Sequence, residues 1–379
     1  MPPCGGNAGR VKCRAFSFRQ ALINKFFRLL PGLDPRTDER FSLRALQWAT
    51  EKNLRKTFPV TPKRLRRRLT QPFHSLGIHF LRFLILPLPL SGVRWLGKVI
   101  GQIIFWVPSC RRVILANLQM VFPANDKAWH RRVGLASSTS LATTVLEFLW
   151  FHCNQERLDR HLFVSPEMSA FLNSKAPNRP SMLFTLHSGN WEMAAIIAGR
   201  YLPPPVTLIA RRFKSAGIER LVTAGRTFAG IQITHEKGAV KDFLKTLKAG
   251  GGIGMLVDQN TKIEQGGVFV DFLGLPATMS RTPATFARRF KCHIGLFPIR
   301  RTAAGFMVEY LPLPEPENAL DDGSLAQTFS DTMSTFIRQH PEEWVWLYKR
   351  WHLIPKEASE EVAARYPFYA RREGTEEED

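Results

Sequence analysis

Short apolar runs separated by stretches of helical composition dominate the sequence beyond Asn117 and limit the possible fold more than any other feature. Each run is four to six residues long, which suits a buried strand, while the intervening stretches, such as 216–228 and 238–248, suit helices. Strands that alternate with helices predict an α/β fold, in which a mixed sheet is covered by helices. The expected strands are 182–186, 206–209, 253–257, 294–299 and 307–310.

Positive charge is concentrated at the N-terminal end of the chain. Residues 1–112 contain 22 Lys and Arg against 4 Asp and Glu, a net charge of +18 out of +21 for all 379 residues. Such an asymmetry predicts docking onto an anionic surface, either phospholipid headgroups or nucleic acid. Residues 1–70 are expected to be a mobile basic extension, and no compact signal peptide begins at Met1.

An apolar region follows at 75–107, but its length and charges do not suit a simple transmembrane helix. Its longest uncharged run, 83–93, has 11 residues, whereas a spanning helix needs about 20. Pro87 and Pro89 disfavour one straight helix. We therefore predict amphipathic, membrane-associated helices within 71–112, with cationic side chains reaching the headgroups. A helical hairpin in the core and a single tilted spanning helix are the alternatives.

The segment 187–192, HSGNWE, places polar residues directly after the expected strand 182–186. His187 would stand at the carboxyl end of that strand, where ligands bind in α/β sheets. Gly189 permits a tight turn, which would let Glu192 in the next helix meet the imidazole. Such a pair could act as a general base on a hydroxyl, with the carboxylate orienting the ring. A buried histidine bonded to a nearby acid for structure is the alternative.

Other catalytic chemistries have little support in the sequence. The five cysteines are far apart, which suits a reducing compartment and argues against a disulfide framework or a zinc ribbon. The patterns His-Glu-x-x-His, Cys-x-x-Cys and Gly-x-Ser-x-Gly are absent. The glycine-rich stretch 250–254 precedes an expected strand and so predicts a turn, not a phosphate loop. We expect no metal and no cofactor.

Four ordered blocks are similar to one known family. They are ANLQMVFP (116–123), HSGNWE (187–192), VDQN (257–260) followed by GGVFVDFLGLPATMSRTPATFARRF (266–290), and EEWVWLYKRWH (342–352). Together these blocks resemble the bacterial lipid A biosynthesis acyltransferases, within the lysophospholipid acyltransferase superfamily. The resemblance extends from about residue 75 to residue 352.

The resemblance implies a glycerolipid acyltransferase-like domain at 113–355, followed by a charged C-terminal tail at 356–379. It implies transfer of a fatty acyl chain from acyl carrier protein to a hydroxyl of a phosphorylated glycolipid, a lipid A precursor, at the cytoplasmic face of the inner membrane. Another membrane glycolipid or phospholipid, such as a phosphatidylinositol mannoside, and acyl coenzyme A as donor are the alternatives. The expected partners are acyl carrier protein, anionic membrane lipids and the glycolipid acceptor.

The resemblance also implies roles for individual residues. His187 would be the base and Glu192 its partner, and direct transfer is expected because no Ser or Cys nucleophile arrangement is recognisable. Five further positions are expected to form the substrate site, with the two arginines as phosphate ligands: Asn190, Arg211, Arg226, Asp258 and Gln259. Two rivals come from other classes, a nucleic-acid-binding protein and a non-catalytic membrane scaffold. No nucleic-acid-binding motif is present, so we expect no nucleic acid partner.

Overall fold

The computed structural model describes residues 76–174, 179–213, 215–235 and 238–374, all of which belong to one unit, Gln71–Asp379. The predicted basic extension, 1–70, lies outside the described residues. After a first helix, Leu76–Ile85, the larger helices are α4 (Leu90–Trp106), α5 (Pro108–Val121), α6 (Lys127–Phe151), α9 (Met193–Tyr201), α10 (Ala216–Thr227), α11 (Ala239–Lys248), α12 (Thr282–Arg289) and α13 (Asp322–Gln339). The shorter ones are α7 (Gln155–His161), α8 (Pro166–Asn173) and α14 (Glu360–Ala364).

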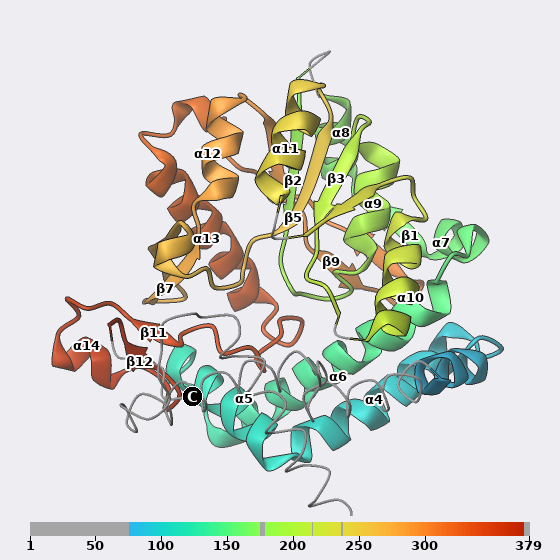
Figure 1. Ribbon diagram of the computed structural model, residues 1–379. Coiled ribbons are helices and arrows are strands. Elements are labelled where there is room, and N and C mark those ends of the chain that lie inside the picture. The colour runs from blue at the N-terminus through green and yellow to red at the C-terminus, as the bar shows by residue number, and fades with distance from the viewer. Residues whose placement is uncertain (1–75, 175–178, 214, 236–237, 375–379) are drawn as a thin grey trace, which may run out of the picture. The chain divides into compact units, whose positions relative to one another are not determined.

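A five-stranded parallel sheet forms the centre of the unit (Figure 1). Its strand order is β4-β3-β5-β2-β8, and every neighbouring pair is parallel. The strands are β2 (Ser181–Thr185), β3 (Val206–Ile209), β4 (Gln232–Thr234), β5 (Gly252–Leu256) and β8 (His293–Leu296). The predicted α/β fold is therefore confirmed. Mixed pairing is found in a second sheet, β1-β10-β9, formed by β1 (Leu162–Val164), β9 (Ile299–Arg301) and β10 (Phe306–Val308).

Successive side chains of the central strands pack alternately into two separate hydrophobic cores. Met182 and Phe184 of β2 pack with α11, α12 and α13, whereas Leu183 packs with α9 and the C-terminal half of α6. This alternation is the period of a strand whose two faces are both covered. Figure 1 shows α11, α12 and α13 on one side of the sheet and α9 and α10 on the other. Burial on both faces explains why these strands read as continuous apolar runs.

The N-terminal helices pack beside α6, which begins where Asp126 caps it by accepting a hydrogen bond from the Trp129 N–H at 2.6 Å. Helix α4 approaches α6 closely: a Cβ at Gly97 would lie 2.3 Å from Thr143 Oγ1, and one at Gly101 would lie 2.4 Å from Thr139 Cα. Among the described helices, none is by itself long and apolar enough to cross a bilayer. Helices α4 and α5 pass that test together, but they meet at a bend of 88°.

Two parts of the chain differ from the sequence prediction. The antiparallel hairpin of β6 (Gly267–Phe272) and β7 (Leu275–Ser280) was not predicted; its two-residue turn has positive φ at Leu273 and at Gly274. The predicted C-terminal tail packs onto the domain as far as residue 374. There β12 (Arg371–Arg372) pairs with β11 (Leu353–Ile354), and the Tyr366 hydroxyl donates to Pro276 O at 2.8 Å.

Candidate active site

The register of two parallel strands brings His187 and Asp258 together. Strands β2 and β5 are neighbours, and Thr185 pairs with Leu256 at their carboxyl ends. His187 and Asp258 each follow two residues later, so their side chains emerge side by side at the edge where α/β proteins bind ligands. The His187 Nδ1 lies 2.7 Å from Asp258 Oδ1, and the His187 N–H donates to Asp258 Oδ2 at 2.9 Å.

The Asp258 carboxylate is fully buried and is held by a third donor, Trp344 Nε1, at 2.9 Å. Burial alone would raise its pKa, but the electrostatic attraction of the adjacent His187 imidazole and the hydrogen bonds from His187 and Trp344 keep the pKa below its ordinary value. A carboxylate only accepts hydrogen bonds, so the ring proton is assigned to Nδ1 and Nε2 keeps its lone pair. That tautomer is the one a general base requires.

Glu192 has a different partner from the one predicted. Both of its oxygens accept from Arg226, from Nε at 2.9 Å and from Nη2 at 2.7 Å. Burial would lower the Arg226 pKa, but the Glu192 carboxylate holds it above its ordinary value. The predicted His187–Glu192 hydrogen bond is therefore wrong. After the turn at Gly189 (φ 55°), it is Trp191 that stands against the imidazole, with ring centroids 5.3 Å apart, while Glu192 faces α10.

A small cleft of about 270 Å³ opens at His187. Trp191, Asp258, Gln259, Trp344 and Tyr348 also line it, and the rest of its wall is aliphatic: Leu141 of α6, Val345 and Leu347. An apolar wall beside a basic nitrogen suits a substrate with a hydrocarbon chain next to its reacting group.

Of the remaining predicted site residues, Gln259 lies at the cleft, Arg211 lies on the surface and Asn190 is buried. The Gln259 side-chain amide lies at the cleft, with its nitrogen 3.1 Å from His187 Nε2. Arg211 is exposed after β3, at the same edge of the sheet. Burial raises the pKa of the Tyr348 hydroxyl, and the positive charges of Arg350 and Arg211 partly offset that rise. Asn190 was expected to contact substrate. Its side chain is instead fully buried, donates a hydrogen bond to Glu147 and does not line the cleft.

The C-terminal block 342–352 supports the two turns that carry His187 and Asp258, a role that its tryptophans and tyrosine did not reveal in the sequence. Besides the Trp344 bond to Asp258, the Val345 N–H donates to His187 O at 3.1 Å. Tyr348 Oη accepts from the Asn260 N–H at 3.0 Å, and Arg350 Nη1 donates to Asn260 Oδ1 at 2.5 Å. Arg350 is fully buried, and this burial lowers its pKa to about 10.

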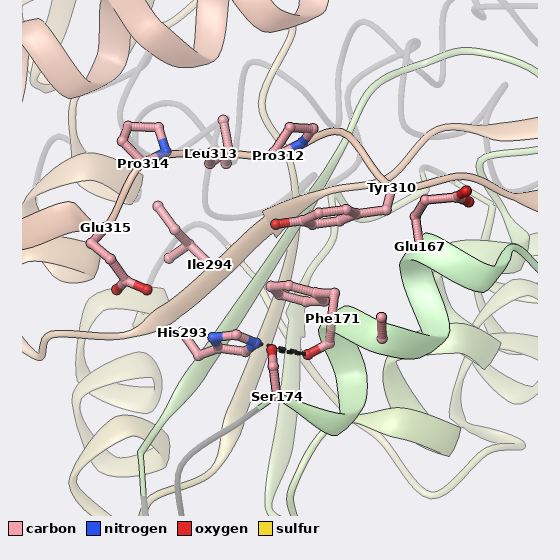
Figure 2. A pocket seen from close by; sticks show the side chains of 11 residues that line it. Glu167, Phe171, Ser174, His293, Ile294, Tyr310, Pro312, Leu313, Pro314 and Glu315 are labelled. Atoms are coloured by element: carbon pink, nitrogen blue, oxygen red, sulfur yellow. Dashed lines mark hydrogen bonds between the residues drawn. The ribbon is translucent and has the colours of Figure 1, made fainter.

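A larger cavity of about 600 Å³ is lined by His293 and Phe171 (Figure 2). His293 is at the amino-terminal end of β8, whereas His187 follows the carboxyl end of the parallel strand β2. Phe171 is stacked between His293, at 4.1 Å, and Tyr310, at 4.6 Å between ring centroids. Glu315 in its wall is paired with Arg179. Within the described ranges, no group of three or more His, Cys, Asp and Glu side chains is arranged to hold a metal ion, in this cavity or elsewhere.

The geometry defines a class of protein: an α/β fold with a hydrogen-bonded histidine–carboxylate pair at the sheet edge, open to an apolar cleft. Comparison with known proteins makes the class specific. Residues 52–353 match the family model described as bacterial lipid A biosynthesis acyltransferase, and the chain therefore belongs to that family. The predicted family and acyltransferase class are thus confirmed.

One similar curated relative is the phosphatidylinositol mannoside acyltransferase of Mycolicibacterium smegmatis. The two sequences are 25% identical over 179 residues. The match covers 46% of this chain and 57% of the relative, so the chain spans little more than half the length of the curated protein that it matches.

Proposed function

We propose that the protein transfers a fatty acyl chain from acyl carrier protein to a hydroxyl of a lipid A precursor. The observation that carries the proposal is the 2.7 Å contact of His187 Nδ1 with a buried aspartate, which directs the basic Nε2 toward an apolar cleft. Family membership supports the acyl transfer itself. No cofactor is required, because acyl carrier protein brings the acyl group as an activated thioester.

The reaction is a direct transfer with His187 as general base. The acceptor hydroxyl first displaces the Gln259 amide from His187 Nε2, since that nitrogen has a single lone pair. Nε2 then removes the hydroxyl proton while the oxygen attacks the thioester carbonyl. The tetrahedral intermediate collapses by breaking the C–S bond, and the departing thiolate takes the proton from the imidazolium. Asp258 stabilises the imidazolium between these two steps.

The acceptor is proposed to bind through its phosphates. Arg226 is oriented by Glu192, which occupies its Nε and Nη2 and leaves Nη1 available for an anion. Arg211 is exposed at the same edge of the sheet and offers a second cation. In this proposal Glu192 belongs to the phosphate-binding side of the site, while Asp258 serves the base.

The membrane-facing surface is proposed to be the outer side of the N-terminal helices. Trp95, Ile103 and Trp106 of α4 recur at helical spacing, and each is more than three-fifths exposed. The preceding helix exposes Leu76, Phe80 and Phe83, also at helical spacing, by 59% or more. The neighbouring cations Lys98 and Arg112 are also exposed and suit anionic headgroups. Attachment through this surface would hold the cleft at the cytoplasmic face of the inner membrane.

Acylation of a phosphatidylinositol mannoside is the second candidate, and it is favoured by the similarity to the mycobacterial enzyme. Both acceptors combine sugar hydroxyls, phosphate and lipid chains. The test uses the purified full chain with acyl-loaded acyl carrier protein or acyl coenzyme A, each radiolabelled in the acyl chain, offered with a lipid A precursor or a phosphatidylinositol mannoside. Label transferred to the lipid A precursor supports the first proposal. Transfer to the mannoside alone replaces it, and label on neither acceptor overturns both.

A further inference from the structure

A buried carboxylate lies beneath the turn 187–190, here called the catalytic turn, and takes no part in the mechanism above. Glu147 lies in the C-terminal half of α6 and is 0% exposed. Its Oε1 accepts from Arg94 Nε at 2.8 Å, and its Oε2 accepts from Arg301 Nε at 2.9 Å. Oε2 also accepts from Asn190 Nδ2 at 2.9 Å. A buried carboxylate with two guanidinium partners and an amide partner is held in one geometry.

These contacts reach the catalytic turn along two routes. The first is the bond to Asn190, which lies three residues after His187. The second passes through Arg301, whose Nη2 donates to Thr144 Oγ1 at 2.5 Å; that hydroxyl in turn donates to Gly189 O at 2.8 Å. The segment that follows the base is thus fixed to α6 by both a side chain and a backbone carbonyl.

The same carboxylate ties the turn to α4. Arg94 comes from α4, and its two remaining nitrogens donate to backbone carbonyls, Nη1 to Thr302 O at 2.5 Å and Nη2 to Gly305 O at 2.8 Å. Trp95, the next residue, points outward and is 67% exposed. One helix therefore carries both the proposed membrane surface and a direct ligand of Glu147.

We propose that Glu147 is a positioning residue for the transfer reaction, and that through Arg94 and Asn190 it links the placement of α4 to the placement of His187. The inference rests on the proposed function. Removing the negative charge would leave the half-buried guanidinium groups of Arg94 and Arg301 without their shared, fully buried partner, which carries an electrostatic cost. The surrounding segments would move to relieve it. A shift of about 1 Å in a catalytic group can cost on the order of 10²-fold in rate.

The test measures kcat and both KM values for Glu147→Gln, Asn190→Ala and the double variant. We expect each single variant to lower kcat by roughly 10- to 100-fold with both KM values within about twofold of wild type, because neither residue touches substrate. The double variant should be no slower than the slower single variant, since both changes interrupt one connection. Glu309→Gln is the matched control, because it removes the carboxylate that Arg300 contacts at 2.9 Å outside this network.

Several outcomes would overturn the inference. These are an unchanged kcat in folded Glu147→Gln, a rise in KM alone, multiplicative losses in the double variant, or an equal loss in Glu309→Gln. Should Glu147→Gln fail to fold, Arg94→Lys keeps the carboxylate but loses the forked contacts with Thr302 and Gly305, and a kcat indistinguishable from wild type would then refute the link to α4. A wild-type chain without transfer activity would refute the proposed function instead.

Discussion

The cavity and the cleft at the two ends of the central sheet differ in volume and in how their polar side chains are arranged. The cavity at the amino-terminal end of β8 has about 600 Å³, yet its rings stack on one another and Glu315 is paired with Arg179. The cleft at the carboxyl end of β2 has about 270 Å³, and there a buried aspartate directs an imidazole toward an apolar wall. Position in the fold and chemistry, more than volume, mark the smaller cleft as the candidate active site.

Removing the base should give the largest effect and would test this contrast most severely. We expect His187→Ala to lower kcat by roughly 10³- to 10⁴-fold, because no other group would accept the hydroxyl proton. The measurement is single-turnover transfer of labelled acyl chain, with circular dichroism to confirm the fold. A variant that keeps near-normal turnover would remove the cleft from the mechanism.

Next in size is the change Asp258→Asn. We expect kcat to fall by on the order of 10²-fold or more, since the amide neither fixes the Nδ1–H tautomer nor stabilises the imidazolium. Donor and acceptor KM should change little, because Asp258 lies behind the ring. Initial rates over a range of both substrates would separate kcat from KM, and a pure KM effect would contradict this role.

The same variant should alter stability in acid. The folded-state pKa of Asp258 lies below its ordinary value of 3.8, so its contribution to stability is present above that pH and is lost as the pH falls through the folded pKa. The Tm difference between wild type and Asp258→Asn should therefore shrink from about pH 5 to about pH 2. A difference that stays constant over this range would argue against a stabilised carboxylate.

Glu192→Gln should have a smaller effect, and it should change the acceptor KM and not kcat. We expect the acceptor KM to rise about tenfold, with kcat within about threefold of wild type, because the variant frees Arg226 from its bidentate partner without touching the base. Arg226→Lys should act in the same direction. If Glu192→Gln instead lowered kcat as much as Asp258→Asn does, Glu192 would belong with the base after all.

The smallest effect is expected at the other end of the sheet. Tyr310→Phe keeps the ring stacked on Phe171 and removes only a hydroxyl from the larger cavity. Transfer kinetics should stay within about twofold of wild type, in the range usual for substitutions outside the active site. A marked loss of activity would show that the two hollows are functionally connected, and the comparison above would need to be redrawn.

The sequence predicted the parts of the fold that depend on local pattern. Strand β3 was placed at its observed bounds, and β2, β5 and β10 within a residue or two, because strands buried on both faces read as continuous apolar runs. The run 294–299 proved to be two strands, β8 and β9, in different sheets. Nothing local marks that break except Pro298, which cannot donate to a sheet ladder.

The candidate site was predicted only in part, since its contacts are not local. His187 was located from its place at the end of a strand, but its partner was sought five residues away and lies 71 residues away. Counting from the ends of two adjacent strands would have found Asp258. Glu147 gave no such signal, because a single acid in an apolar helix does not reveal that Arg94 and Arg301 will converge on it.

The pairing of Thr185 with Leu256 also indicates which changes of chain length the enzyme could tolerate. His187 and Asp258 meet because each lies two residues beyond a paired strand residue. Inserting one residue into either two-residue link would displace one of them by about 3.3 Å. The loops that join the other helices and strands between β2 and β5 carry no such constraint on this pair. They could be lengthened, trimmed or exchanged with those of relatives, provided that both two-residue links and the contacts of Asn190 and Glu192 are preserved.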